Sequence, residues 1–253
     1  MILPAVLLAG SSSWEAAVWA GLLAGLLCLD DTALGQTWLG QPLPAALLSG
    51  FLFGDPLAGL ALGLPLQLVL VGNLPIGQTF TAEATAAVVA AVGAAAHGGW
   101  RLVPAVRGPA AEPGPNPLGL LGWLLVAVGL VSLLGHVIVQ AERRAHGVWM
   151  QVGRLSLRDG SLARMERLHL RCLVVTFLRG ALLAALFLVA LQQGWIPAFP
   201  LLGERMHGAL ALLPMLLPGV GIGTMVDRYG PRRSWLWVTA GAVLAFAAAR
   251  LKG

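Results

Sequence analysis

Long apolar segments alternate along this chain with short polar interruptions. The apolar segments lie at 3–29, 43–54, 57–76, 84–104, 117–140, 172–193, 207–226 and 234–250. A helix needs about 20 residues to cross the hydrocarbon core of a membrane, so the longer segments predict transmembrane helices. The pattern therefore predicts an all-α polytopic membrane protein.

Two neighbouring segments do not fit a simple span. The segment 43–54 is too short, and it ends at a Gly-Asp-Pro sequence, 54–56, that stops a helix. The next segment, 57–76, is interrupted by Pro65 and by the stretch 72–77. Non-helical backbone at membrane depth must be buried in protein or line a cavity, because lipid cannot satisfy its N–H and C=O groups. We therefore expect short re-entrant or broken hairpins here.

The two halves of the chain both contain an apolar segment interrupted by Gly and Pro. A block rich in Gly and Pro occurs at 47–65 and again at 210–223. Corresponding broken segments in two halves indicate an inverted repeat of the transporter kind. We divide the chain into an N-terminal membrane half, 1–104, a Pro/Gly loop, 105–116, a transmembrane helix, 117–140, an Arg-rich segment, 141–171, and a C-terminal membrane half, 172–253.

Composition strengthens the membrane assignment. The chain is 58% hydrophobic and 11% charged, with a mean hydropathy of +0.82, whereas soluble domains carry about a quarter charged residues. Its net charge of +5 is small and lies in loops, so we expect no nucleic-acid partner. The two cysteines define no disulfide framework and are interpreted as packing residues.

Charge also predicts sidedness. The segment 141–171 holds seven arginines against three acidic residues, which marks it as cytoplasmic under the positive-inside rule. Its apolar residues recur at near-helical spacing, which fits a helix on the membrane surface or a solvated loop helix equally well. A second basic turn, 227–233, follows one span and one outer loop later, so it falls on the same side.

Acidic residues in or beside apolar segments are the first candidates for chemistry, because a charge at bilayer depth is costly. Each also has a structural explanation. The five are Glu15, Asp30, Asp31, Asp55 and Glu83. An interfacial position accounts for Glu15, and helix capping accounts for Asp30 and Asp31. A turn or cap accounts for Asp55, whereas we expect Glu83, which follows a polar bend, to face a cavity.

Amides in the same region are the second group of candidates. Gln36, Gln67, Asn73 and Gln78 offer donors and acceptors without net charge. That chemistry suits a polyhydroxylated solute such as a sugar, although amides also bridge membrane helices. Motifs of soluble enzymes are absent from the sequence, including phosphate-binding loops, a G-x-S-x-G turn and Cys/His pairs at metal spacing. We therefore expect no cofactor, no metal and no catalytic role.

The order of residues across 29–77 resembles a known family. The positions that hold the family's register are Asp30, Thr32, Gly35, Gln36, Pro42, Gly54, Asp55 and Gly59, followed by Gly63, Gly72, Ile76-Gly77 and Ala82-Glu83. The family is the membrane IIC subunit of the mannose-class (mannose/fructose/sorbose) sugar phosphotransferase system. The match is specific over these fifty residues and looser beyond them.

The resemblance implies a IIC permease subunit in a bacterial cytoplasmic (inner) membrane, translocating a hexose-type sugar. It also implies a IID membrane partner, soluble IIA and IIB subunits that carry out the phosphotransfer, and a homotrimer. The segment 62–83 is then a broken hairpin at the sugar site. The residues expected to contact the sugar are Asp30, Gln36, Gln67, Asn73 and Glu83.

This chain departs from the family at several of these positions. Gln67 replaces the family's Glu, Gln41 replaces an Arg, and Ala82-Glu83 replaces a Pro-Asp pair. A carboxylate accepts sugar hydroxyls more strongly than an amide does. The substitutions leave two interpretations, a permease tuned to a different sugar or a transport-impaired relative that serves as a membrane scaffold or regulatory partner.

Overall fold

The computed structural model describes residues 12–32, 35, 37–70, 83–103, 116–158, 160–230, 239–241 and 243. Within these residues every regular element is helical, which confirms the all-α prediction. Four helical stretches are long and apolar enough to cross a membrane, at Ser13–Asp30, Pro117–Leu157, Leu162–Leu201 and Glu204–Thr224. The elements are α2 (Ser13–Thr32), α3 (Pro42–Phe53), α4 (Pro56–Leu70), α5 (Ala84–His97), α6 (Pro117–Arg158), α7 (Leu162–Ala190), α8 (Ile196–Ala198) and α9 (Glu204–Tyr229).

Helices α3 and α4 form the short hairpin that the sequence predicts. They have 12 and 15 residues, so they are about 18 and 22 Å long and fall short of a bilayer core. Gly54 ends α3 in the left-handed region at φ 81°. The Asp55 carboxylate then accepts a hydrogen bond from the N–H of Ala58 at 3.0 Å and caps α4. Asp55 is therefore a capping residue, as the turn sequence indicates.

Pro65 does not break α4, so the predicted interruption there is wrong. The helix continues through Pro65 to Leu70. Proline removes one intrahelical hydrogen bond, but such positions are tolerated in membrane helices when neighbouring helices pack closely. Gly59 and Gly63, in the two turns before Pro65, bring α4 into close contact with the backbone of α3. The second predicted interruption, 72–77, lies outside the described residues.

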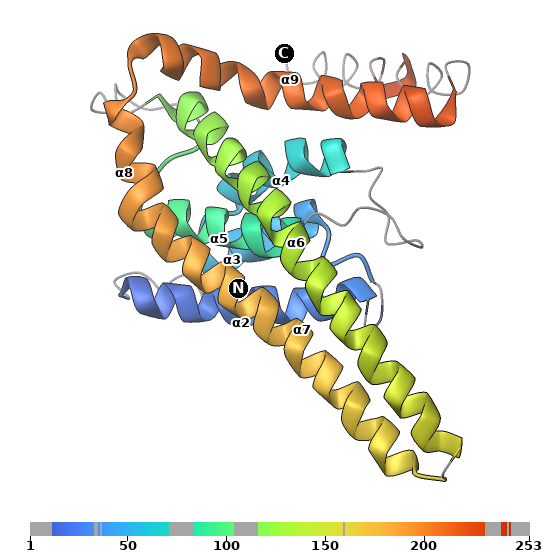
Figure 1. The fold of residues 1–253 in the computed structure, drawn as a ribbon. Helices are drawn as coiled ribbons and strands as arrows, with labels where there is room; N and C mark the ends of the chain where they lie inside the picture. Colours follow the sequence, from blue (N-terminus) through green and yellow to red (C-terminus); the bar gives the residue numbers. More distant parts are fainter. Residues whose placement is uncertain are drawn as a thin grey trace.

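Helix α5 lies at the centre of the bundle, between α2 and α9 in Figure 1. Every residue from Ala84 to Ala95 is buried, and α5 contacts α2, α3, α4, α6 and α7. The residues of this buried stretch are all Ala, Val, Thr or Gly. Such small side chains let surrounding helices approach closely, which matters where lipid gives no hydrophobic drive for association.

Helices α6 and α7 form a long hairpin. α6 has 42 residues, so it is about 63 Å long, roughly twice the bilayer core. It does not end at residue 140 but continues into the Arg-rich segment, because 141–158 contains no Pro and is rich in strong helix formers. The segment 141–171 is thus the end of the hairpin, which projects from the bundle (Figure 1).

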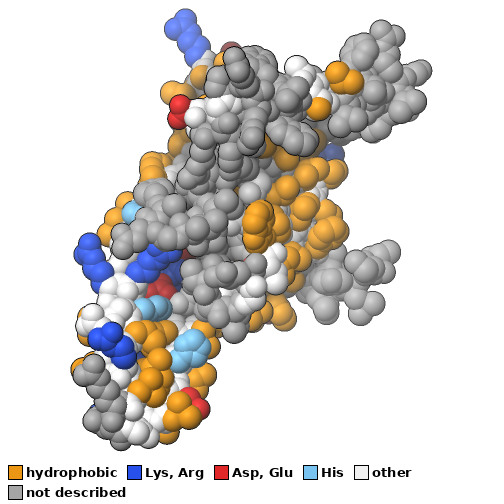
Figure 2. Space-filling model, turned by 90° about the vertical axis from the view of Figure 1, so that its right-hand side faces the viewer, with side chains coloured by type: hydrophobic (Ala, Val, Ile, Leu, Met, Phe, Trp, Pro, Cys, Tyr) orange, Lys and Arg blue, Asp and Glu red, His pale blue; other side chains and the backbone are white. Residues whose placement is uncertain are grey.

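The projecting end exposes both charged and apolar side chains. Arginines lie there beside hydrophobic residues, as the lower part of Figure 2 shows. Val148, Val152 and Leu155 are exposed on α6, and Arg171 of α7 lies over the ring of Trp149 at 4.1 Å. This end of the hairpin is therefore amphipathic.

Candidate functional site

The chain between α2 and α3 forms a loop, residues 37–41, that is fastened by Asp30. One carboxylate oxygen accepts hydrogen bonds from the N–H and the hydroxyl of Thr37, both at 2.8 Å. The other accepts from the N–H of Gly40 at 3.3 Å. Between them Trp38 is 62% exposed and has φ 69°, a conformation that costs energy for a bulky residue. Asp30 therefore holds a strained loop in place and does not cap α3.

Gln67 of α4 fastens the other end of the 37–41 loop. Its amide oxygen accepts a hydrogen bond from the N–H of Leu43 at 3.2 Å. Its amide nitrogen donates to the side-chain oxygen of Gln41 at 3.5 Å. Gln67 thereby satisfies an N–H in the first turn of α3, where no earlier carbonyl of the helix is available. The Gln41–Gln67 contact is long and leaves both amides with spare hydrogen-bonding capacity.

Helix α5 contacts the same loop through its first turn. The Thr85 hydroxyl donates to the carbonyl oxygen of Gly40 at 2.5 Å. Asp30 of α2, Gln67 of α4 and Thr85 of α5 therefore all hold the 37–41 loop. Two residues before Thr85 lies Glu83, the first described residue after the segment 71–82.

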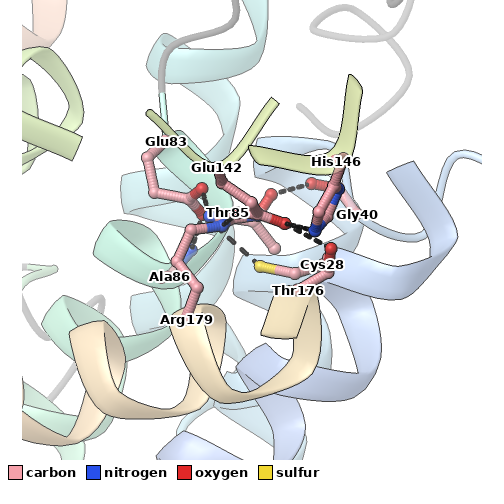
Figure 3. Close-up of polar contacts among 9 residues, drawn as sticks. All are labelled: Cys28, Gly40, Glu83, Thr85, Ala86, Glu142, His146, Thr176 and Arg179. Atoms are coloured by element: carbon pink, nitrogen blue, oxygen red, sulfur yellow. Dashed lines mark hydrogen bonds and ion pairs between the residues drawn. The ribbon is translucent and has the colours of Figure 1, made fainter. Parts of the chain in front are cut away.

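A cluster of charged side chains lies next to this loop. Arg179 of α7 forms ion pairs with Glu83 at the start of α5 and with Glu142 of α6. The exposed fractions of the three side chains are 11%, 5% and 8% respectively. Figure 3 shows the guanidinium between the two carboxylates, with Gly40 and Thr85 close by. We call Glu83, Glu142 and Arg179 the Arg179 cluster.

Protein groups contact Glu83 at its carboxylate, its backbone N–H and its Cβ. Its Oε1 accepts from the N–H of Ala86 at 3.4 Å, which caps α5, and from the thiol of Cys28 at 3.4 Å. Its own N–H donates to the carbonyl of Ser132 in α6 at 3.2 Å. Gly135 leaves the room that this side chain needs, because a Cβ there would collide with the Cβ of Glu83. A carboxylate has about four acceptor positions, so these contacts leave little spare capacity.

Glu142 has partners of its own on α6 and α7. The Thr176 hydroxyl donates to Glu142 Oε1, and His146 Nε2 lies 3.7 Å from the same oxygen. The cluster thus contains two carboxylates against one guanidinium, with an imidazole beside them. Burial of this kind is tolerated only where charges are paired and hydrogen-bonded.

Three of the five predicted sugar-contact residues fall within the described part of the chain. Asp30 and Gln67 meet at the 37–41 loop, while Glu83 belongs to the Arg179 cluster and faces protein groups. Gln36 and Asn73 lie outside the described residues. Of the acidic residues that were also considered, Glu15 accepts from the N–H of Ser12 at 2.7 Å in a reciprocal helix cap.

Sequence reasoning missed Arg179 and Glu142. Arg179 interrupts the apolar run "LVVTFLRGALLAA" of α7, and a charge within a membrane segment is a functional signal by itself. That signal was available from the sequence. The identity of its partners was not, because they come from distant parts of the chain.

Comparison with known proteins supplies a family. The family model described as the sorbose-specific IIC component of the phosphotransferase system (PTS) matches residues 14–250. The match covers all the helices described above except the first residue of α2. The chain has no match among curated proteins. Among the described residues no group of three His, Cys, Asp or Glu side chains is placed to hold a metal ion.

Proposed function

Since the chain belongs to the sorbose-specific IIC family of the sugar phosphotransferase system, we propose that it carries a hexose-type sugar across the bacterial inner membrane. Transport is coupled to phosphorylation of the sugar by soluble IIA and IIB subunits. A IID subunit completes the membrane complex, and three copies of this chain assemble within it. The chain itself supplies the passage and performs no phosphotransfer.

The sugar site proposed here comprises Asp30, Gln36, Gln67, Asn73 and Glu83. The observation that supports it is the convergence of α2, α4 and α5 on the 37–41 loop. Helix α4, which carries Gln67, ends at Leu70, and the described chain resumes at Glu83 before α5. Hydrogen bonds through the loop therefore connect the two helices that flank residues 71–82.

The chemistry of these groups suits a sugar. Hydroxyl groups of a sugar both donate and accept hydrogen bonds, as amides do, and carboxylates accept strongly. Each such bond contributes roughly 0.5–1.5 kcal/mol, so loss of one should weaken sugar binding by roughly twofold to tenfold. The long Gln41–Gln67 contact, 3.5 Å, is the bond of the loop most readily exchanged for one to a ligand.

One observation favours a second function, that of a transport-impaired scaffold or regulatory subunit. Gln67 stands where the resemblance places a Glu. A carboxylate at this position would equally accept the hydrogen bond from the N–H of Leu43, but it would lose the long contact in which the amide donates to Gln41. A position that binds sugar hydroxyls through a carboxylate in the family therefore offers a weaker acceptor here.

Sugar uptake separates the two functions. A strain lacking its own mannose-class permeases would receive this chain with its IID, IIA and IIB partners, and uptake of labelled L-sorbose, D-fructose and D-mannose would be measured. We expect accumulation of the phosphorylated form of at least one sugar, lost when any partner is omitted. An assembled complex that accumulates none of the three would instead support the scaffold.

The projecting end of the α6–α7 hairpin is placed on the cytoplasmic side in this proposal, because of its seven arginines. Ala163 is exposed near the tip and suits a cysteine reporter. An Ala163→Cys variant should resist impermeant thiol reagents in intact cells and react after the cells are opened. Reaction in intact cells would reverse the orientation.

A further inference from the structure

Four helices meet at one guanidinium. Arg179 belongs to α7 and pairs with Glu83 at the start of α5 and with Glu142 of α6. Cys28 of α2 joins through its hydrogen bond to Glu83. Arginine suits this role because its planar fork presents donors to two acceptors at once, which the point charge of lysine does less well.

Arg179 also determines where the Glu83 carboxylate points. The Cβ of Glu83 lies against Gly135, and its N–H is bound to Ser132, so the residue's backbone is fixed on α6. The carboxylate then lies between Arg179 and the first turn of α5, with Oε1 on the N–H of Ala86 and Oε2 on the guanidinium. Without the guanidinium a buried carboxylate would be left unpaired and would seek other partners or a proton.

The position of Glu83 matters because it caps the first turn of α5. Gln67 of α4 holds the 37–41 loop from one side. Thr85, two residues after Glu83, holds the same loop from α5. A displacement of Glu83 would therefore move the start of α5 and loosen the loop that Asp30, Gln67 and Thr85 maintain.

We propose that Arg179 is a positioning residue of the sugar site, an inference that rests on the proposed function. It does not touch the sugar. It fixes Glu83 and the first turn of α5 against the α6–α7 hairpin, and so keeps Thr85 in place to hold the 37–41 loop. Glu142 holds the guanidinium in orientation from α6.

The test replaces Arg179 by Met and by Lys in a Cys172→Ser background, with Arg171→Met as the matched control. Arg171 lies two turns earlier on α7, is exposed, and stacks on Trp149 outside the cluster. The complete complex in membrane vesicles would be assayed for phosphorylating uptake of L-sorbose, D-fructose and D-mannose. Alkylation of Cys28 by N-ethylmaleimide would be followed in parallel, because this thiol is only 2% exposed and bonds to Glu83.

Positioning predicts a specific pattern. Arg179→Met should raise KM at least tenfold while Vmax stays within threefold, since binding is weakened before and during transport alike. It should also speed alkylation of Cys28 at least tenfold. Arg179→Lys should fall between wild type and Arg179→Met on both measures, and Arg171→Met should match wild type.

Several results would overturn the inference. One is an Arg179→Met protein with unchanged KM and unchanged Cys28 reactivity. If that variant does not assemble, Arg179→Lys decides, and a KM within a factor of two of wild type contradicts positioning. A wild-type complex that takes up none of the three sugars would count against the proposed function instead, while the Cys28 rates would still show whether Arg179 holds Glu83.

Discussion

The 37–41 loop and the Arg179 cluster are neighbouring polar regions of the bundle, and they hold their side chains differently. The loop is half exposed, is built from one carboxylate and neutral donors, and contains a strained Trp38. The cluster is buried, and its charges are paired with each other. The loop therefore retains groups that can exchange partners with a ligand, whereas the cluster is committed to the fold.

Glu83 belongs to the cluster and lies two residues from the loop's contact with α5, so its removal should have the largest effect. Glu83→Ala should lower sugar affinity about tenfold or more, because it leaves the buried Arg179 with one ion pair fewer and removes the cap of α5. Gln67→Ala removes only neutral hydrogen bonds and should lower affinity about threefold to tenfold. Equilibrium binding of labelled hexoses to the purified complex would measure both. A larger effect of Gln67→Ala would reverse the roles given to the two regions.

The packing of Glu83 against α6 predicts opposite effects on stability for two glycine substitutions in that helix. Gly135→Ala places a methyl group against the Cβ of Glu83, and such overpacking costs about 1–3 kcal/mol. Gly129→Ala on the same helix meets nothing within 4 Å and should stabilise α6 by about 0.5–1 kcal/mol. Thermal unfolding of the two purified variants compares them directly, and equal unfolding temperatures would contradict the tight packing of the cluster.

Restoring the family's Glu at position 67 of α4 should change sugar uptake by a smaller factor than the loss of Glu83 does. Gln67→Glu keeps the acceptor for the N–H of Leu43 but loses the donor to Gln41. If the chain is a weakened permease, uptake should rise about threefold to tenfold, in line with one stronger hydrogen bond. If the site is tuned to another sugar, uptake of the native sugar should fall by a similar factor. Unchanged uptake and binding would remove Gln67 from the site.

The smallest effect concerns loop strain. Trp38→Gly and Trp38→Ala remove the same side chain, but only glycine adopts a positive φ without cost. The glycine variant should therefore be more stable than the alanine variant by about 1 kcal/mol. Chemical denaturation of the two complexes would measure the difference. An alanine variant as stable as the glycine variant would show that the loop is not strained at this position.

The sequence pattern located most elements of this fold because lipid-compatible segments and Gly-Asp-Pro turns are local signals. It failed at Pro65, where close packing of α3 on α4 permits a helix that proline alone would interrupt. The pattern also placed the end of a helix at residue 140, although α6 continues to Arg158. At residue 140 the side chains change from apolar to polar, but the helical backbone continues.

The candidate residues could be selected from the sequence for a related reason. Asp30, Gln67 and Glu83 stand out as polar residues in apolar surroundings, so composition alone identifies them. Their partners depend on tertiary contacts that no spacing encodes. Arg179, which comes from a distant helix and pairs with the Glu83 carboxylate, is one such partner.

Protection of the 37–41 loop by sugar tests the central claim most directly. Leu39 is 46% exposed in this loop, and its cysteine variant, in a Cys172→Ser background, would report on access to the site. We predict that saturating transported hexose slows alkylation of Leu39→Cys at least fivefold and leaves Ala163→Cys, at the hairpin tip, unaffected. A complex that transports the sugar while Leu39→Cys reacts at the same rate with and without it would place the sugar site elsewhere.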